Sequence, residues 1–336
     1  MRPKKIQWTR ELSLSLILIT LIVVFGRINP RIVTVSNLIV QLRNMTGAAT
    51  LAVAILPIMI TGCVDLSFMM IASFSRTVAV IIGGAIGGRN TNPILVMVIA
   101  GVVGALIALV NCFFVTKYKI PSIITSLAMV EILIGLTNLV GGRRFFLITS
   151  NVSAIQAFLD RDLVAFVNDQ GLIIRLKYSI FVPVILSILM YLFLKFTSLG
   201  RHIYAVGGDV EVARRVGINV PFTMGASYSI LGFMCGFFSV MQMSASPANS
   251  MGAGTEFNIL ACVILGGLIL GYGNGSVLGT LLAVIITVFV QNSCLLLGVP
   301  AQVQKFMMGA LLIASLVSTA YSKKASYIEY KPQNMR

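Results

Sequence analysis

The sequence predicts an all-α membrane protein with about ten transmembrane helices and a weak internal parallel repeat. Of its 336 residues, 57% are hydrophobic and 10% are charged, whereas a soluble domain carries roughly 25% charged residues. The 25 lysine and arginine residues lie in short clusters between long uncharged stretches. This distribution is typical of a multi-pass membrane protein, so the net charge of +15 does not indicate a nucleic-acid partner.

The uncharged stretches locate helices of about 20 residues, the length that crosses a lipid bilayer. The longest stretch, 257–304, contains a glycine-rich turn at 271–276 that divides it into two spans. The predicted spans are 11–28, 40–61, 68–87, 93–116, 122–140, 178–197, 222–243, 257–271, 276–297 and 302–321. They fill the chain as one transmembrane domain over 1–336. The even number of predicted spans and the basic residues that flank them place both termini in the cytoplasm. The largest connection on that side is then 198–221, and the connection 141–177 lies outside.

An internal repeat relates residues 51–67 to residues 260–276 at a constant offset of 209. Seven of the 17 positions are identical, namely Leu51/Leu260, Ala52/Ala261, Ile55/Ile264, Leu56/Leu265, Ile60/Ile269, Gly62/Gly271 and Ser67/Ser276. The predicted spans give the two copies the same direction through the membrane, so the repeat is parallel.

Motifs for catalysis are not found in the sequence. It contains no Gly-Lys dipeptide, which excludes a phosphate-binding loop of the Walker type, and no HExxH zinc motif. The five cysteines form no CxxC pair, and the one histidine, His202, lies in a predicted connection. We therefore expect no enzyme activity, no metal and no cofactor in this chain itself.

The cytoplasmic connection over 198–221 has the composition of a short helix with defined ends. Asp209 can accept hydrogen bonds from the free amide groups at a helix N-terminus, and Gly217 suits the left-handed conformation that ends a helix. A helix over 210–216 would carry the Arg214–Arg215 pair late in its length. It could dock into a groove of a soluble partner, or it could be an ordinary amphipathic loop helix.

The same connection closely resembles the cytoplasmic segment of inner-membrane permeases of ribose/galactose-type ABC importers, the family that handles simple sugars and autoinducer-2-like molecules. The matching residues are Gly200, Arg201, Tyr204, Ala205, Gly207, Gly208, Ala213, Gly217, Ile218 and Val220, with Asp209 in place of the usual asparagine. A first signature is similar at Gly62, Asp65, Leu66 and Ser67, although Cys63 and Met69 replace glycines. A further signature is similar at Glu256, Ala261, Gly266, Gly267, Gly271, Gly273, Gly275, Ser276, Gly279 and Thr280.

The resemblance implies a permease subunit of an ATP-driven importer that moves a small polar solute, a monosaccharide or sugar-like molecule, across the bacterial inner membrane by alternating access. The implied partners are a cytoplasmic ATPase that holds ATP-Mg, a second permease subunit (an identical copy or a sister chain), a periplasmic binding protein and membrane lipid. The residues implied to couple to the ATPase are Gly207, Gly208, Asp209, Glu211, Ala213, Arg214 and Gly217. The alternative is an ion-coupled secondary transporter, with Asp65 or Glu131 carrying the ion.

Polar residues within the predicted spans are candidates for the translocation pathway, because an unpaired amide in lipid costs several kcal/mol. They are Asn111, Glu131, Gln242, Asn258, Gln291 and Asn292. Four charged residues lie in or beside spans, and each has a structural alternative. Asp65 and Glu256 could cap helices, and Arg76 could snorkel or bind carbonyl groups. Glu131 could line the pathway or form a hydrogen bond between helices. The glycines over 266–279 favour tight packing of the eighth and ninth spans, with a direct role in the pathway as the alternative.

Overall fold

The computed structural model describes residues 4–87, 91–150, 162–167, 173–241, 255–300, 302–307, 309–310 and 313. Within these residues helices make up most of the chain, as predicted. The helices are α1 (Lys4–Ile28), α2 (Val35–Ile60), α3 (Phe68–Gly87), α4 (Pro93–Lys117), α5 (Ser122–Ser150), α7 (Phe181–Phe196), α8 (Ser198–Gly208), α9 (Val210–Arg215), α10 (Val220–Met241), α11 (Thr255–Leu265) and α12 (Val277–Leu296). Two 3-10 turns, η1 (Pro30–Val33) and η3 (Tyr178–Ile180), precede α2 and α7.

Seven of the described helices are long and apolar enough to cross a membrane, namely α1, α2, α3, α4, α5, α10 and α12. An eighth span arises if α7 and α8, which meet at a bend of 74°, are counted together. The predicted number of about ten is therefore approximate. The span expected at 178–197 is the 16-residue α7, and the span expected at 302–321 lies mostly outside the described residues.

The span predicted at 257–271 is wrong in its extent. The helix α11 has 11 residues and ends at Leu265, too short to cross a bilayer. It ends there because Gly267 adopts φ +108°, a left-handed conformation that stops a helix. The remaining residues of the predicted span form a turn held by an isolated bridge between Ile269 and Asn274.

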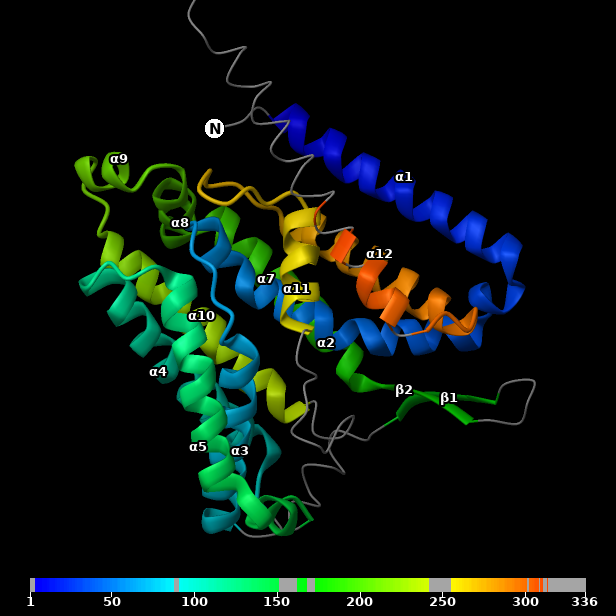
Figure 1. The fold of residues 1–336 in the computed structure, drawn as a ribbon, viewed down its shortest axis with the longest axis horizontal. Coiled ribbons are helices and arrows are strands. Elements are labelled where there is room, and N and C mark those ends of the chain that lie inside the picture. The colour runs from blue at the N-terminus through cyan, green and yellow to red at the C-terminus, as the bar shows by residue number, and fades with distance from the viewer. Residues whose placement is uncertain are drawn as a thin grey trace, which may run out of the picture.

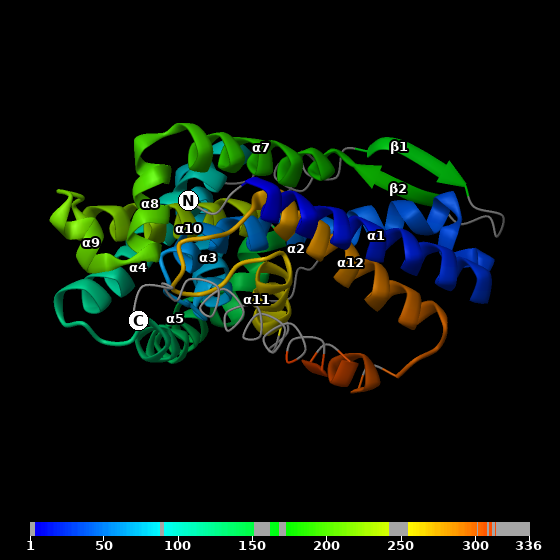
Figure 2. The ribbon, with the colours of Figure 1, turned by 90° about the horizontal axis from the view of Figure 1, so that it is seen from above.

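The segment at 141–177, predicted as an external connection, contains regular structure that was not expected from the sequence. The helix α5 continues to Ser150, and a hairpin pairs β1 (Asp162–Val167) with β2 (Ile173–Lys177) in antiparallel register. The hairpin leads into the start of α7 (Figure 2), and β2 lies against α2. Its strands are rich in Val, Ile, Leu and Phe, which suits β-structure.

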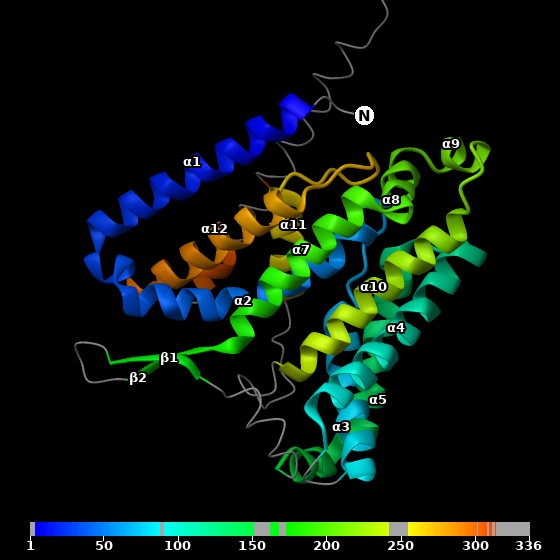
Figure 3. The ribbon, with the colours of Figure 1, turned by 180° about the vertical axis from the view of Figure 1, so that it is seen from behind.

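The helices form two groups that meet at α2. In one group α10 packs along α3 and α4, and α5 packs on α3; in the other, α12 packs on α2 and α1 lies on α12 (Figures 1 and 3). The backbones of α4 and α10 are in direct contact. A side-chain carbon added to Gly104 would collide with the carbonyl oxygen of Gly232, and one added to Gly232 would collide with the carbonyl oxygen of Gly104. Such glycines let membrane helices approach closely. Most of α2 is buried, whereas between Glu11 and Ile28 the helix α1 has Leu14 as its one buried residue.

The two copies of the repeat have the same architecture, a helix, a break and a second helix. The pairs α2–α3 and α11–α12 both run first toward the end of the molecule where α8 lies and then away from it (Figure 1). Their breaks touch, since a side-chain carbon on Gly62 would lie 3.5 Å from the Cα atom of Gly271, its counterpart in the repeat. This arrangement agrees with the predicted parallel repeat.

Candidate functional site

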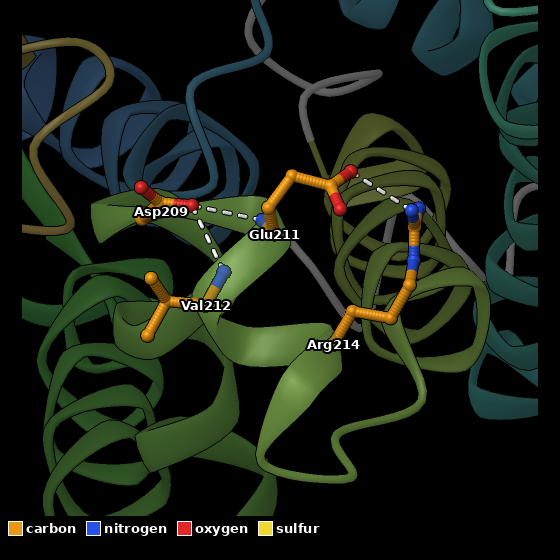
Figure 4. A network of polar contacts seen from close by, with 4 residues as sticks. All are labelled: Asp209, Glu211, Val212 and Arg214. Carbon is orange, nitrogen blue, oxygen red and sulfur yellow. Dashed lines mark hydrogen bonds and ion pairs between the residues drawn. The ribbon is translucent and has the colours of Figure 1, made fainter.

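The helix α9 begins at Val210, as predicted, and ends at Arg215, one residue before the predicted end. One carboxylate oxygen of Asp209 accepts hydrogen bonds from the backbone N–H groups of Glu211 (2.8 Å) and Val212 (3.0 Å), and so caps the N-terminus (Figure 4). At the other end Gly217 has φ +86°, and its N–H donates to the carbonyl of Arg214. Both ends of this six-residue helix are thus fixed by local hydrogen bonds.

The two faces of α9 differ in character. On the inner face, Ala213 is buried against Val206 and Val220. On the outer face, Glu211 and Arg214 form an ion pair of 2.8 Å, with their side chains 67% and 57% exposed (Figure 4). Val212 and Val216 are exposed beside them. The outer face therefore offers opposite charges and apolar side chains together, a composition suited to contact with another protein.

Three segments that are distant in the sequence meet where α8 ends. A side-chain carbon on Gly207 would collide with the carbonyl oxygen of Ile60, the last residue of α2. A side-chain carbon on Gly273 would collide with the carbonyl oxygen of Tyr204. By contrast, a side-chain carbon added to Gly208 would meet no atom within 4 Å. The backbone of α8 therefore lies directly against the α2–α3 break and the α11–α12 break.

A tyrosine hydroxyl reinforces this junction. The Tyr204 hydroxyl donates a 3.0 Å hydrogen bond to the carbonyl of Gly275. Burial raises the pKa of Tyr204 to about 12, so the hydroxyl stays protonated and available as a donor. Gly275 is itself buried, and a side-chain carbon there would lie 2.9 Å from the side chain of Ile60. Tyr204 and Ile60 are not among the site residues predicted from the sequence, although Tyr204 lies in the matching pattern.

Four glycines at the α11–α12 break, Gly266, Gly273, Gly275 and Gly279, are closely packed, whereas Gly271 is exposed with open space beside it. A side-chain carbon on Gly266 would lie 2.6 Å from the backbone of Thr280 on α12. The break ends at Ser276, whose hydroxyl accepts from the N–H of Gly279 (3.2 Å) and donates to Glu11 of α1 (2.6 Å). Ser276 thus caps α12 and links it to the first helix.

The α2–α3 break holds a fully buried carboxylate. The side chain of Asp65 accepts hydrogen bonds from the N–H (2.6 Å) and hydroxyl (2.5 Å) of Ser67. It also accepts one from the side-chain amide of Asn111 on α4 (3.1 Å). The same amide lies 2.9 Å from the Ser67 hydroxyl. Asp65 therefore joins the start of α3 to α4, in agreement with its alternative interpretation as a helix cap.

The polar residues predicted to line a pathway lie in different environments. Asn111 and Asn292 are buried, and the amide of Asn292 donates to the side-chain oxygen of Asn37 (2.8 Å). Asn258 and Gln291 are half-buried on α11 and α12. Gln242 lies outside the described residues. The four of these side chains that the structure describes do not form one cluster, and the role of all of them in the pathway stays a prediction.

The remaining intramembrane charges lie on three different helices, α3, α5 and α11. Arg76 is 2% exposed in the middle of α3, so it does not snorkel to the membrane surface. Glu256 lies in the first turn of α11, where a carboxylate is stabilised by the helix dipole. Glu131 is exposed on α5.

The family model described as branched-chain amino acid transport system / permease component matches residues 37–316, which is most of the chain. The chain belongs to this permease family. It is a multi-pass membrane protein and not an enzyme.

Curated relatives of this permease are similar over nearly their whole length. The ribose import permease protein of Escherichia coli K12 is 26% identical over 314 residues, which cover 92% of this chain and 94% of the relative. The autoinducer 2 import system permease protein of E. coli O9:H4 is 26% identical over 321 residues, which cover 95% of this chain and 94% of that relative. No solved structure matches the chain.

Proposed function

We propose that this permease is the transmembrane subunit of an ATP-driven importer that carries a small polar solute across the bacterial inner membrane. The names of its relatives, ribose import permease and autoinducer 2 import permease, support a monosaccharide or sugar-like solute. The partners are a cytoplasmic ATPase that binds ATP-Mg, a second permease subunit and a periplasmic binding protein. Both termini lie in the cytoplasm, on the side of α8 and α9.

The observation that carries the proposal is the backbone junction of α8 with both breaks of the repeat. The helix α9 is exposed, has fixed ends and continues from α8, so a partner that pushes on α9 also moves α8. Because Gly207 lies against the carbonyl of Ile60 and Gly273 against that of Tyr204, this movement reaches α2 and α12. ATP-driven closure of the ATPase would thereby shift the two helix groups, which is the motion that alternating access needs.

The ion-coupled alternative is not favoured. Asp65, the best candidate for an ion carrier, is 0% exposed, and its carboxylate already accepts hydrogen bonds from Ser67 and Asn111. A carboxylate held in this way joins α3 to α4 and has a structural role without any bound ion.

The test exchanges the charges of the exposed ion pair. The double variant Glu211→Lys/Arg214→Glu keeps an ion pair within α9 but reverses both charges presented to a partner. We expect at least about tenfold less ATPase to co-purify with the permease, because like charges placed together at an interface cost several kcal/mol. Solute-stimulated ATP hydrolysis should fall with it, while membrane insertion is retained.

A second pair of variants tests the rigidity of α9. Gly217→Val places a β-branched residue at φ +86° and should cost about 1–2 kcal/mol locally. Gly217→Asn is the matched control, since asparagine tolerates the left-handed conformation. Coupling should be weaker for the valine variant than for the asparagine variant. Normal co-purification and normal stimulation in a chain that carries Glu211→Lys, Arg214→Glu and Gly217→Val together would refute α9 as the coupling helix.

A further inference from the structure

The last turn of α4 holds a lysine ammonium group between two aromatic rings. The Nζ atom of Lys117 lies 4.9 Å from the centre of the Phe113 ring, one turn earlier, and 5.7 Å from the centre of the Tyr118 ring. These two rings are in edge-to-face contact at 5.8 Å, and Phe114 stacks on Tyr118. Because a cation is attracted to the faces of aromatic rings, the ring cluster holds the ammonium group in place.

The last turn of α7 repeats this arrangement. The Nζ atom of Lys195 lies 4.9 Å from the centre of the Tyr191 ring and 5.3 Å from that of Phe196. It also donates a 2.5 Å hydrogen bond to the Tyr191 hydroxyl. In both helices the rings belong to the fourth residue before the lysine and to the residue after it. We call these two groups the lysine–aromatic clusters, Phe113–Lys117–Tyr118 and Tyr191–Lys195–Phe196.

Each cluster lies where the exposed apolar side of its helix ends. On α4 the exposed residues Leu106 and Val110 precede the cluster on the same side, and on α7 Ile188 and Leu192 do so. Aromatic residues gather at the level of the lipid headgroups, and a lysine stem can follow apolar surface while its ammonium group stays in water. The two ammonium groups therefore lie at headgroup depth, on sides of the helices that face lipid.

The two clusters lie at the two ends of the coupling segment 198–221. The helix α7 leads directly into α8, which begins three residues after Lys195. The last turn of α4 lies beside the first turn of α10, which follows α9 (Figures 1 and 3). Both ammonium groups are thus at one membrane surface, which under the proposed function is the cytoplasmic one.

Neither lysine forms an ion pair with the residues that the structure describes. The carboxylates of the coupling segment are already engaged, since Glu211 pairs with Arg214 and Asp209 caps α9. An ammonium group has three N–H donors. Lys117 donates to no described group, and Lys195 makes only the hydrogen bond given above. Both side chains are exposed and retain donors for an anion.

We propose that the two lysine–aromatic clusters bind the headgroups of anionic phospholipids, one at each end of the coupling segment. The phosphate oxygens accept charge-assisted hydrogen bonds from the ammonium group, and the acyl chains lie along the exposed apolar residues that precede each cluster. The cytoplasmic leaflet carries a negative surface potential that attracts such lysines. A zwitterionic headgroup carries its own cation, which repels the ammonium group, so the clusters select lipids with a net negative charge.

A headgroup bound at each cluster holds both ends of the coupling segment at a fixed depth. A partner that pushes on α9 then moves α8 relative to two points that are held by the membrane. This consequence rests on the proposed function, whereas the binding of an anionic headgroup does not, and the experiment therefore measures binding by the permease alone.

The experiment measures lipid binding at each cluster by quenching of tryptophan fluorescence. The chain has one tryptophan, Trp8. In a Trp8→Phe chain, Tyr118→Trp or Phe196→Trp places a single fluorophore in one cluster and retains an aromatic ring there. The permease is reconstituted in phosphatidylcholine bilayers with increasing fractions of phosphatidylglycerol that carries bromine, a short-range quencher, on its acyl chains. Brominated phosphatidylcholine gives the reference. We expect phosphatidylglycerol to bind about fivefold more strongly at both reporters, the effect of one lysine near the membrane surface.

Each lysine serves as the matched control for the other. Lys117→Gln should lower the preference to about one at the Tyr118→Trp reporter and leave it unchanged at the Phe196→Trp reporter, and Lys195→Gln should do the reverse. Lys117→Arg and Lys195→Arg keep the charge and should retain the preference. Lys305→Gln, the same change of charge in the segment after α12, should alter neither reporter.

The other outcomes also decide the question. Equal binding of the two lipids at both reporters of the unaltered clusters would overturn the inference. An equal loss at both reporters in any of the glutamine variants would also overturn it, because it would show a response to net charge and not to a site. An unchanged lipid preference in Lys117→Gln and Lys195→Gln, together with less co-purifying ATPase, would assign the lysines to the contact with the ATPase instead. Failure of the proposed function is seen separately, in the α9 variants described above.

Discussion

The two breaks of the repeat have the same plan but different surroundings. Each contains a glycine with positive φ, Gly62 at +91° and Gly271 at +74°, and each ends at a serine one residue before the next helix. Two residues before that serine, the α2–α3 break has Asp65, which is fully buried, and the α11–α12 break has Asn274, which is half-buried. One copy is thus sealed inside the bundle, and the other remains partly open.

The partners of the two breaks explain this difference. Asp65 bonds to Ser67 and across to α4, whereas Asn274 bonds only within its own turn, accepting from the N–H of Ile269 (2.9 Å). The α11–α12 break meets α8 through Gly273 and Gly275, and the other break meets α8 at Ile60, the last residue of α2. Both copies of the pattern therefore contact the coupling segment, and the first also serves as an anchor to α4 through Asp65.

The largest effect is expected where α8 touches both breaks. Gly207→Ala places a methyl group against the carbonyl oxygen of Ile60, and backbone atoms cannot move aside as side chains do. We expect a loss of about 3 kcal/mol in the free energy of unfolding, measured as a lower midpoint of thermal unfolding in detergent. The matched control is Gly208→Ala on the same helix, where the methyl group meets nothing. Similar midpoints for the two variants would show that the junction is loosely packed.

A smaller effect is expected at the anchor. Asp65→Ala leaves the donors of Ser67 and Asn111 buried without an acceptor, which should cost about 2 kcal/mol. At the equivalent position Asn274→Ala removes one half-buried hydrogen bond and should cost about 1 kcal/mol. Asp65→Asn keeps an acceptor oxygen and should fall between them. Thermal unfolding in detergent measures all three, and equal losses for the two alanine variants would remove the distinction between the breaks.

The smallest effect concerns the serine that ends the second break. Ser276→Ala removes the cap of α12 and the link to Glu11, for an expected loss of about 1 kcal/mol. Ser276→Thr retains a hydroxyl and should be close to the unaltered chain in thermal unfolding. If alanine and threonine behave alike, the hydroxyl contributes nothing to the stability of the open copy.

Features determined by neighbours in the sequence were predictable. The ends of α9 follow from Asp209 and Gly217, since a cap needs only residues within one turn, and both ends lie within one residue of where the sequence predicts them. The long apolar helices were predictable for a similar reason, because length and composition alone determine whether a helix can span a bilayer.

Features that depend on distant contacts were not predictable from the sequence. The close packing of Gly266 against Thr280, just after the end of α11, joins two helices, and the apolar run gave no sign of it. The meeting of Gly207 with Ile60 joins residues from two different spans. The position of Glu131 was open for the same reason, since no periodic pattern shows which side of α5 packs on α3.

The contact between backbones at the end of α8 has a mechanical consequence. A junction made of long side chains is compliant, because rotamer changes absorb a displacement before it travels further. At Gly207 and Gly273 main chain lies on main chain, and folded interiors of this kind compress little. A displacement of α8 is therefore transmitted directly both to α2 and to the α11–α12 turn. As a result, the two halves of the repeat move together.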